Sequence, residues 1–148
     1  MKLDDALRGV SDLAFDTAPI IYFVEANPTY DELVSNIFNR VAAGEIEGWT
    51  SVITLSEVLV QPLASERDDL RELYRDLLLD SFNFHTIPIN AAVAESAARM
   101  RANYGLRLPD ALQVALAVET GCEALLCNDH SMRRVTELRV LVLDDLEL

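Results

Sequence analysis

Short apolar runs alternate with amphipathic helical segments along the chain, and this alternation constrains the fold more than any other feature of the sequence. The runs have the length of buried strands, and the segments between them carry apolar residues at helical spacing. Such alternation is typical of an α/β domain with a mostly parallel sheet. We therefore expect a three-layer α/β/α fold, in which a mostly parallel central sheet is flanked by helices.

The positions of the elements follow from apolar spacing and from helix-ending residues. Strands are expected over residues 13–16, 49–52, 84–87, 124–127 and 140–143. Helices are expected over residues 2–9, 19–25, 30–43, 91–104 and 110–120. Pro62 is expected to end a further helix and Ser65 to cap the one after it. No linker or repeat divides the 148 residues, so we expect a single domain over residues 1–148.

Composition limits the class of protein. A hydrophobic fraction of 51% with 25% charged residues excludes a disordered chain. No apolar run approaches the roughly 20 residues that cross a bilayer, and the N-terminal MKLDDALRGVSD lacks the pattern of a signal peptide. We therefore expect a cytoplasmic protein with no membrane partner. Cys122 and Cys127 do not form a CxxC pair, so both are expected to be buried and reduced.

The net charge of −13 restricts how the protein can act on nucleic acid. Proteins that coat nucleic acid are usually basic, because neutralising phosphate supplies most of their affinity. An acidic chain needs attraction from a bound metal, a local arginine cluster or a basic partner. The charge therefore argues against general DNA coating and leaves a metal-assisted nuclease open.

Four acidic side chains, the acidic quartet, are expected where a strand ends or a helix begins. The quartet consists of Asp16, Glu57, Asp110 and Asp129. Taken singly, each is more often a capping or solvated residue than a site residue. In an α/β fold, however, strand ends line one crevice, and carboxylates that converge there repel unless a cation neutralises them. The quartet therefore indicates a divalent metal site.

The order of these motifs is similar to that of a known family. The segments are LAFDTAPIIYF, TLSEVLV, LRLPDALQVALA and LLCNDHSM. Together they resemble the PIN-domain ribonucleases, and especially the small VapC-type toxins of toxin–antitoxin pairs. The resemblance spans residues 13–143 and implies a Mg²⁺-dependent endoribonuclease that cleaves RNA phosphodiester bonds. It also implies a homodimer and a cognate antitoxin protein as partners.

The resemblance also implies a role for individual residues. It implies that the quartet holds Mg²⁺, for which Mn²⁺ can substitute, and that Thr17 and Asn128 support these ligands. Cys127 departs from the family, which usually has Thr or Ser there, and a thiol is a weaker hydrogen-bonding group than a hydroxyl. Basic residues that flank the expected site are candidates for contacts with RNA phosphates. They are Arg107, Arg133 and Arg134.

Two other functions can be weighed against a nuclease. One is a non-catalytic module of the same fold that binds a partner, which the acidic composition and Cys127 would suit. The other is a phosphatase or receiver domain, which also uses carboxylates and Mg²⁺. That class expects a lysine near the end of a later strand, and the only lysine here is Lys2. We therefore discount the second alternative.

Overall fold

Every pair of neighbouring strands in the central sheet is parallel, and the strand order is β3-β2-β1-β4-β5. The computed structural model describes residues 1–148. The strands are β1 (Asp12–Phe15), β2 (Glu47–Ser51), β3 (Phe84–Ile87), β4 (Ala124–Cys127) and β5 (Arg139–Val142). None of the helices combines the length and the apolarity that crossing a bilayer requires.

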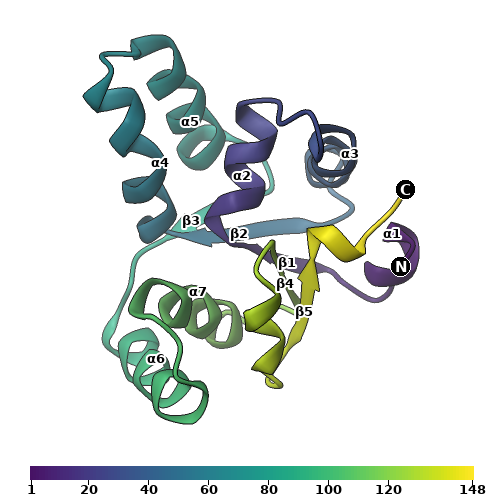
Figure 1. Ribbon diagram of the computed structural model, residues 1–148, viewed down its shortest axis with the longest axis vertical. Coiled ribbons are helices and arrows are strands. Elements are labelled where there is room, and N and C mark those ends of the chain that lie inside the picture. Colours follow the sequence, from purple (N-terminus) through teal and green to yellow (C-terminus); the bar gives the residue numbers. More distant parts are fainter.

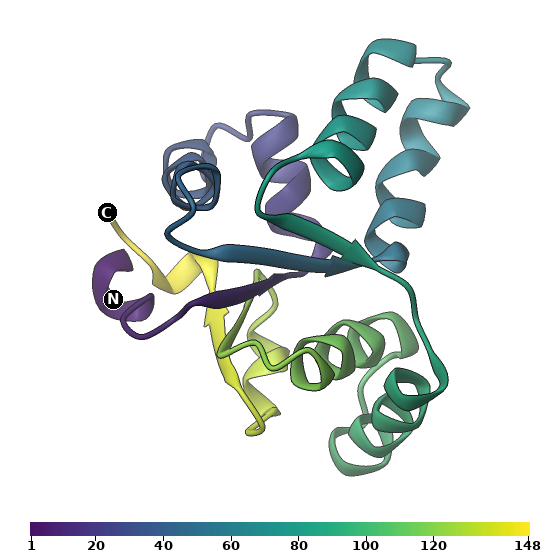
Figure 2. The same ribbon diagram turned by 180° about the vertical axis from the view of Figure 1, so that it is seen from behind.

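Helices cover both faces of the sheet, which confirms the expected three-layer α/β/α fold. The α-helices are α1 (Leu3–Ala6), α2 (Thr17–Val24), α3 (Asp31–Ala42), α4 (Val52–Ala64), α5 (Asp68–Asp80), α6 (Ala91–Tyr104) and α7 (Leu108–Glu119). Two short 3₁₀ helices, η1 (His130–Arg134) and η2 (Leu143–Asp145), follow β4 and β5. Helices α2 to α5 lie on one side of the sheet, and α6 and α7 on the other (Figures 1 and 2).

The sheet separates two hydrophobic cores. Side chains alternate along a strand, so Leu13 and Phe15 of β1 join the core beneath α2 to α5, whereas Ala14 joins the core beneath α6 and α7. In β4 the second core takes Leu125 and Cys127. Burial on both faces explains why these strands read as continuous apolar runs in the sequence.

The strand order creates a topological switch point between β1 and β4. The chain moves outward from β1 through β2 to β3 and then returns to β4 on the other side of β1. The helices that connect β1, β2 and β3 therefore lie on one face of the sheet, and those that connect β3 to β4 lie on the other, so the two groups separate between β1 and β4. In open parallel sheets the ligand site lies at such a switch point, outside the carboxyl ends of the strands. Asp16 directly follows β1, and Asp129 lies just beyond β4.

Several expected elements are confirmed by the structure. The strands over residues 84–87 and 124–127 have the expected bounds. Asn90 caps α6, since its side chain accepts a hydrogen bond from the backbone N–H of Val93 at 2.9 Å. Gly105 ends that helix with a φ of 66°, a left-handed conformation that glycine adopts without a steric penalty.

Two predictions about helix ends were wrong. Pro62 does not end α4, which continues to Ala64; the proline ring is buried, and this packing offsets the lost backbone hydrogen bond. Ser65 does not cap the next helix. It ends α4 instead, and α5 begins at Asp68, whose carboxylate suits the positive end of a helix dipole. Most remaining bounds differ from expectation by one to three residues.

Candidate active site

The acidic quartet is drawn from four elements that meet near the carboxyl edge of the sheet. Asp16 occupies the N-cap position of α2, and Asp129 caps η1. Asp110 lies in the first turn of α7, as expected. Glu57 lies in the second turn of α4. The expectation that this residue lies where a helix begins was therefore wrong by about one turn.

Asp16 lies at the electrostatic centre of the quartet. Burial, the largest cause, acts together with repulsion from Asp110, Glu57 and Asp129 to raise the pKa of its carboxyl group from 3.8 to about 6. The backbone N–H of Thr17 opposes this change. The other three carboxylates are therefore near enough to Asp16 to disfavour its negative charge.

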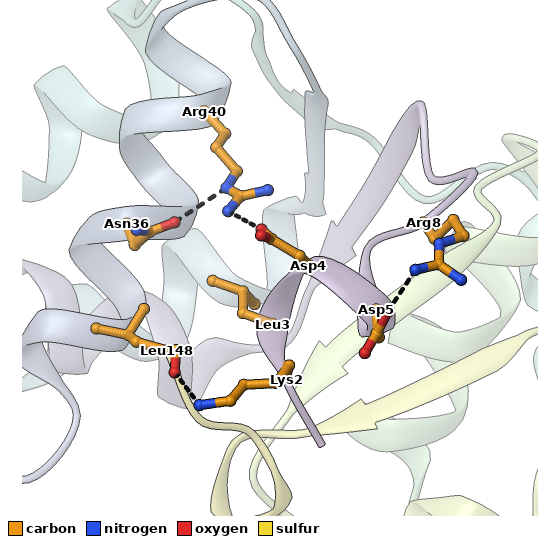
Figure 3. A pocket seen from close by; sticks show the side chains of 8 residues that line it. All are labelled: Lys2, Leu3, Asp4, Asp5, Arg8, Asn36, Arg40 and Leu148. Carbon is orange, nitrogen blue, oxygen red and sulfur yellow. Dashed lines mark hydrogen bonds and ion pairs between the residues drawn. The ribbon is translucent and has the colours of Figure 1, made fainter.

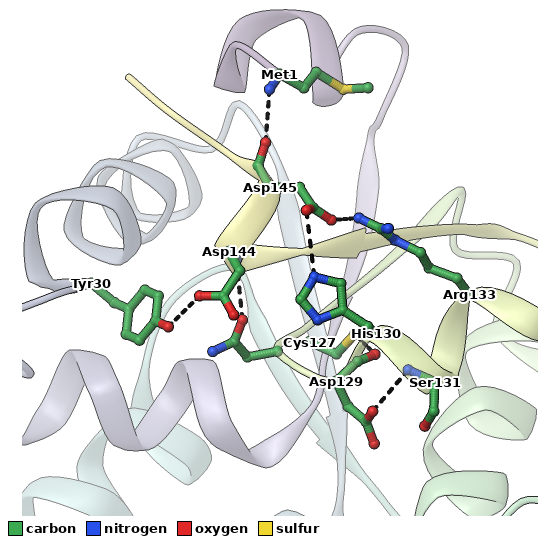
Figure 4. Close-up of polar contacts among 10 residues, drawn as sticks. Met1, Tyr30, Cys127, Asp129, His130, Ser131, Arg133, Asp144 and Asp145 are labelled. Carbon is green, nitrogen blue, oxygen red and sulfur yellow. Dashed lines mark hydrogen bonds and ion pairs between the residues drawn. The ribbon is translucent and has the colours of Figure 1, made fainter.

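Two members of the quartet have partners of their own. The carboxylate of Asp110 is 16% exposed, and its Oδ2 lies 3.2 Å from Nε of Arg107. Oδ1 of Asp129 accepts a hydrogen bond from the backbone N–H of Ser131 at 2.9 Å (Figure 4). Hydrogen bonding from the side chain and then the backbone of Ser131 lowers the pKa of Asp129, and the positive charges of Arg107 and Arg134 lower it further. Asp129 is thus held as a carboxylate beside Asp16.

The donor set of the quartet fits a hard divalent cation. No three His, Cys, Asp or Glu side chains are grouped closely enough to coordinate an ion as they stand. Mg²⁺ does not need such a cage, because it keeps several waters and binds through one or two carboxylates. Asp16 is half-buried and faces three like charges, and a cation would relieve this repulsion. Carboxylate oxygens are the ligands that suit Mg²⁺ and Mn²⁺.

The two residues expected to support the quartet behave differently. The hydroxyl of Thr17 donates to Oε1 of Glu57 at 3.3 Å, which orients that exposed carboxylate. Asn128 instead joins β4 to neighbouring elements. Its Nδ2 donates to the hydroxyl of Tyr22 at 3.4 Å, and its Oδ1 accepts from the backbone N–H of Asp144 at 3.1 Å. Its contacts therefore fix the chain after β4 without touching the carboxylate of Asp129.

Cys127 lies where the resemblance to PIN-domain ribonucleases implies a residue with a hydroxyl group. The side chain is buried, and its thiol donates to the backbone carbonyl of Asp129 at 3.7 Å. Burial raises the pKa of this thiol to about 12, and repulsion from Asp16, Asp129 and Asp110 acts in the same direction. The sulfur is therefore a neutral, weak donor that supports the backbone of the fourth acid. Both cysteines are buried and free, as expected.

The three flanking arginines have different surroundings. Arg107 and Arg134 both lower the pKa of Asp129 through their charge, so they lie near the quartet. Nε of Arg134 also donates to the backbone carbonyl of Ser131 at 3.0 Å. Arg133 forms an ion pair with Asp145, which also lies 3.4 Å from Nε2 of His130 (Figure 4).

The family to which the chain belongs follows from its sequence as a whole. The family model described as "PIN domain" matches residues 13–138. The chain belongs to the PIN domain family. This result confirms the resemblance that the four motifs suggest. Comparison with curated proteins gives no significant match.

Solved structures share the fold of this PIN domain. The VapBC2 complex from Rickettsia felis, bound to a DNA fragment from its promoter, gives a TM-score of 0.71 at 16% identity over 88% of this chain and 98% of that chain. A toxin–antitoxin complex from Klebsiella pneumoniae gives 0.68 at 23% identity, over 88% and 97%. FitAcB from Neisseria gonorrhoeae gives 0.68 at 16% identity, over 88% and 97%. At these identities the likeness shows the fold alone.

A group of buried polar residues behind the quartet was not expected from the sequence of this PIN domain. They are Thr50, Ser51, Thr54 and Gln113, of which none is more than 2% exposed. A signal for two of them was present in the sequence. Thr54 precedes Glu57 by three residues and Gln113 follows Asp110 by three, which places each on the same helix face as an acid.

One cavity in the PIN domain lies away from the quartet. Its volume is about 480 Å³, and it is formed by α1, part of α3 and the C-terminal residue (Figure 3). Two of its arginines are already paired, Arg8 with Asp5 and Arg40 with Asp4. Because no member of the quartet lines it, the cavity adds nothing to the candidate site.

Proposed function

We propose that this PIN domain is a Mg²⁺-dependent endoribonuclease and the toxin of a toxin–antitoxin pair, with Mn²⁺ able to replace Mg²⁺. The observation that carries the proposal is the environment of Asp16, a half-buried carboxylate whose pKa is raised to about 6 by burial and by the rest of the quartet. Membership of a family that consists mainly of metal-dependent nucleases supports the same reading.

The quartet would hold the ion, and the other residues would organise the substrate around it. When bound, Mg²⁺ increases the acidity of water and neutralises charge that develops on the phosphate. Arg107, which is exposed and lies next to Asp110, is placed to bind an RNA phosphate, and Arg134 extends positive charge along the same edge. Arg133 would add to this charge from further away, since it pairs with Asp145.

The cysteines do not supply an alternative nucleophile. A cysteine attacks as its thiolate, and burial raises the pKa of Cys122 to about 11 and that of Cys127 to about 12. Both groups therefore stay protonated at neutral pH. A hydrolysis that is assisted by the quartet needs no such nucleophile.

The proposed partners follow from charge and from the solved relatives. The solved relative from Klebsiella pneumoniae is a toxin–antitoxin complex. A cognate antitoxin for this chain would present basic residues, because the chain carries a net charge of −13. An arginine placed beside Asp16 would neutralise the quartet in the place of the cation. We also propose a homodimer.

A cleavage assay tests the proposal. Purified protein is incubated with a pool of structured RNAs in Mg²⁺, in Mn²⁺ and in EDTA, and cleavage is expected only with a divalent ion. Asp110→Asn should abolish this cleavage, whereas Glu119→Gln, an exposed position at the end of the same helix, should not. Equal cleavage by wild type and Asp110→Asn would identify a contaminant and overturn the assignment.

A second candidate is a non-catalytic PIN module that binds a basic partner. The net charge of −13 favours it. The two functions differ in their response to metal, because only the nuclease requires an ion at the quartet. Stabilisation of the fold by Mn²⁺ that is lost in Asp16→Asn would support the nuclease.

A further inference from the structure

One buried hydrogen bond connects the two layers of helices behind the quartet. Nε2 of Gln113, in α7, donates to Oγ1 of Thr54, in α4, at 2.6 Å. Gln113 is 2% exposed and Thr54 is fully buried. Because α4 and α7 cover opposite faces of the sheet, a direct bond between them is possible only beyond the strand ends (Figure 1). That region is also where the quartet lies.

The bond joins the two helical turns that carry acids. Thr54 lies one turn before Glu57 in α4, and Gln113 lies one turn after Asp110 in α7. Within a helix the distance between such neighbours is fixed. The separation of Thr54 and Gln113 therefore sets the separation of the two backbone segments from which Glu57 and Asp110 project.

The orientation of the Gln113 amide is determined by its other contact. Oγ of Ser51 accepts the backbone N–H of Ile53 at 3.1 Å, which leaves its hydroxyl hydrogen free to donate to Oε1 of Gln113 at 2.7 Å. The carbonyl end of the amide is thereby occupied, and the NH₂ end faces Thr54. Gln113 thus also links α7 to the residue that caps α4.

The network reaches the quartet through Thr17. The hydroxyls of Thr54 and Thr17 lie 3.3 Å apart, and Thr17 donates to Oε1 of Glu57, also at 3.3 Å. Thr54 accepts from the amide of Gln113 and from the hydroxyl of Thr50 at 2.8 Å, so its own hydrogen is left to donate to Thr17. Thr17 directly follows Asp16, so the same contacts connect α7 to the start of α2.

We propose that Gln113 and Thr54 are positioning residues that fix Glu57 and Asp110 relative to Asp16 for metal binding. The inference rests on the proposed metal-dependent function. The hydrogen bond of 2.6 Å adds a directional constraint between Gln113 and Thr54 to the packing of the surrounding apolar core. The exposed carboxylate of Glu57 depends on this support, because its only hydrogen bond in the structure comes from Thr17.

Mn²⁺ titration of isosteric variants tests the proposal. Gln113→Met and Thr54→Val remove the bond with little change in volume, and each should weaken Mn²⁺ binding about tenfold or more, a typical effect of losing a group that orients a metal ligand. Thr54→Ser keeps the hydroxyl and should restore affinity close to the wild-type value. At saturating Mn²⁺ the variants should lower kcat for RNA cleavage and leave KM for RNA unchanged.

A matched control separates positioning from stability. Val34→Ala truncates a fully buried side chain in α3, away from the quartet, and should lower Tm without changing Mn²⁺ affinity. Should Gln113→Met fail to fold, Ser51→Ala offers a milder change that frees only the carbonyl end of the amide. It is expected to weaken Mn²⁺ binding by less than Thr54→Val does.

The positioning role of Gln113 and Thr54 and the proposed metal-dependent nuclease function fail on different outcomes. Wild-type protein that binds Mn²⁺ and cleaves RNA, alongside Gln113→Met and Thr54→Val with unchanged affinity, would overturn the positioning role alone. Wild-type protein that neither binds Mn²⁺ nor cleaves RNA would overturn both proposals. A third outcome is that Val34→Ala loses as much Mn²⁺ affinity as Thr54→Val. In that case the network contributes only to the general stability of the fold, and the positioning role is overturned.

Discussion

Nε of Arg107 lies 3.2 Å from Oδ2 of Asp110, so the first turn of α7 carries a cation beside one acid of the quartet. The two side chains differ in exposure, at 80% for Arg107 and 16% for Asp110. The guanidinium can therefore turn toward solvent while the carboxylate stays in place. Its charge also lowers the pKa of Asp129. Arg107 thus stands at the entrance to the quartet.

Replacing Arg107 tests whether this cation binds RNA. In an Asp16→Asn background that prevents cleavage, Arg107→Ala should weaken RNA binding and reduce the slope of log K against log salt by about 0.7, the value of one phosphate contact on a single strand. Fluorescence anisotropy at several KCl concentrations measures both quantities. Arg99→Ala, an exposed change in α6, is the control and should leave the slope unaltered. An unchanged slope in Arg107→Ala would remove this residue from the RNA site.

Arg133 and Arg134 are neighbours in η1, yet we expect them to differ. Arg134 acts on Asp129, whereas Arg133 is paired with Asp145. Arg134→Ala should therefore lower the salt slope by about 0.7, as expected for one lost contact, and Arg133→Ala should lower it less. The same anisotropy titrations compare the two variants directly. A larger effect from Arg133→Ala would show that its pairing with Asp145 breaks when RNA binds.

The sequence was sufficient for the sheet, and it placed two members of the proposed quartet just beyond neighbouring strands. Fully buried strands such as β4 stand out as uninterrupted apolar runs, and parallel strands place their carboxyl ends together. Asp16 and Asp129 could therefore be predicted to approach each other without coordinates. Asp110 was recognisable because it follows Pro109 in a helix start.

Tertiary packing determined two features that the sequence did not predict, the end of α4 and the contacts of Asn128. Pro62 reads as a helix end, but its ring is buried within α4, and that burial outweighs the local preference. Asn128 was expected to support Asp129, yet it bonds to Tyr22 and to the backbone of Asp144. Partners so distant in sequence follow from the positions of α2 and η2 beside the end of β4, which no local pattern encodes.

The two thiols should be unreactive in the folded protein. With a pKa of about 12, Cys127 is a thiolate in only roughly one molecule in ten thousand at pH 8. Cys122, at about 11, is roughly tenfold more ionised but still almost entirely a neutral thiol, and both side chains are buried. Iodoacetamide labelling followed by mass spectrometry should therefore modify neither residue until urea unfolds the chain. Labelling of native Cys127 at the rate of a free thiol would contradict the burial described here.

Asp16 links the proposed metal site to stability. Its pKa is about 6 in the folded protein and 3.8 without the fold, so the folded state binds this proton more tightly. The stability that this group contributes is therefore complete below pH 3.8 and is lost as the pH rises through 6. At neutral pH the metal-free protein carries an unfavourable charge there, at a cost of up to about 3 kcal/mol.

Asp16→Asn should consequently stabilise the metal-free protein while it removes metal binding. In EDTA at pH 7.5 we expect the variant to exceed wild type by up to about 3 kcal/mol in free energy of unfolding, because the amide carries no charge. The difference should shrink as the pH falls toward 4. Urea unfolding at several pH values measures this difference in the free energy of unfolding, and Glu119→Gln, an exposed change, should show no such trend.

Added Mn²⁺ should stabilise wild type and leave Asp16→Asn unaffected. An Asp16→Asn variant that is less stable than wild type at every pH would contradict the expected stabilisation. It would mean that favourable contacts hold the Asp16 carboxylate, and that the repulsion on which the proposed metal site depends is absent.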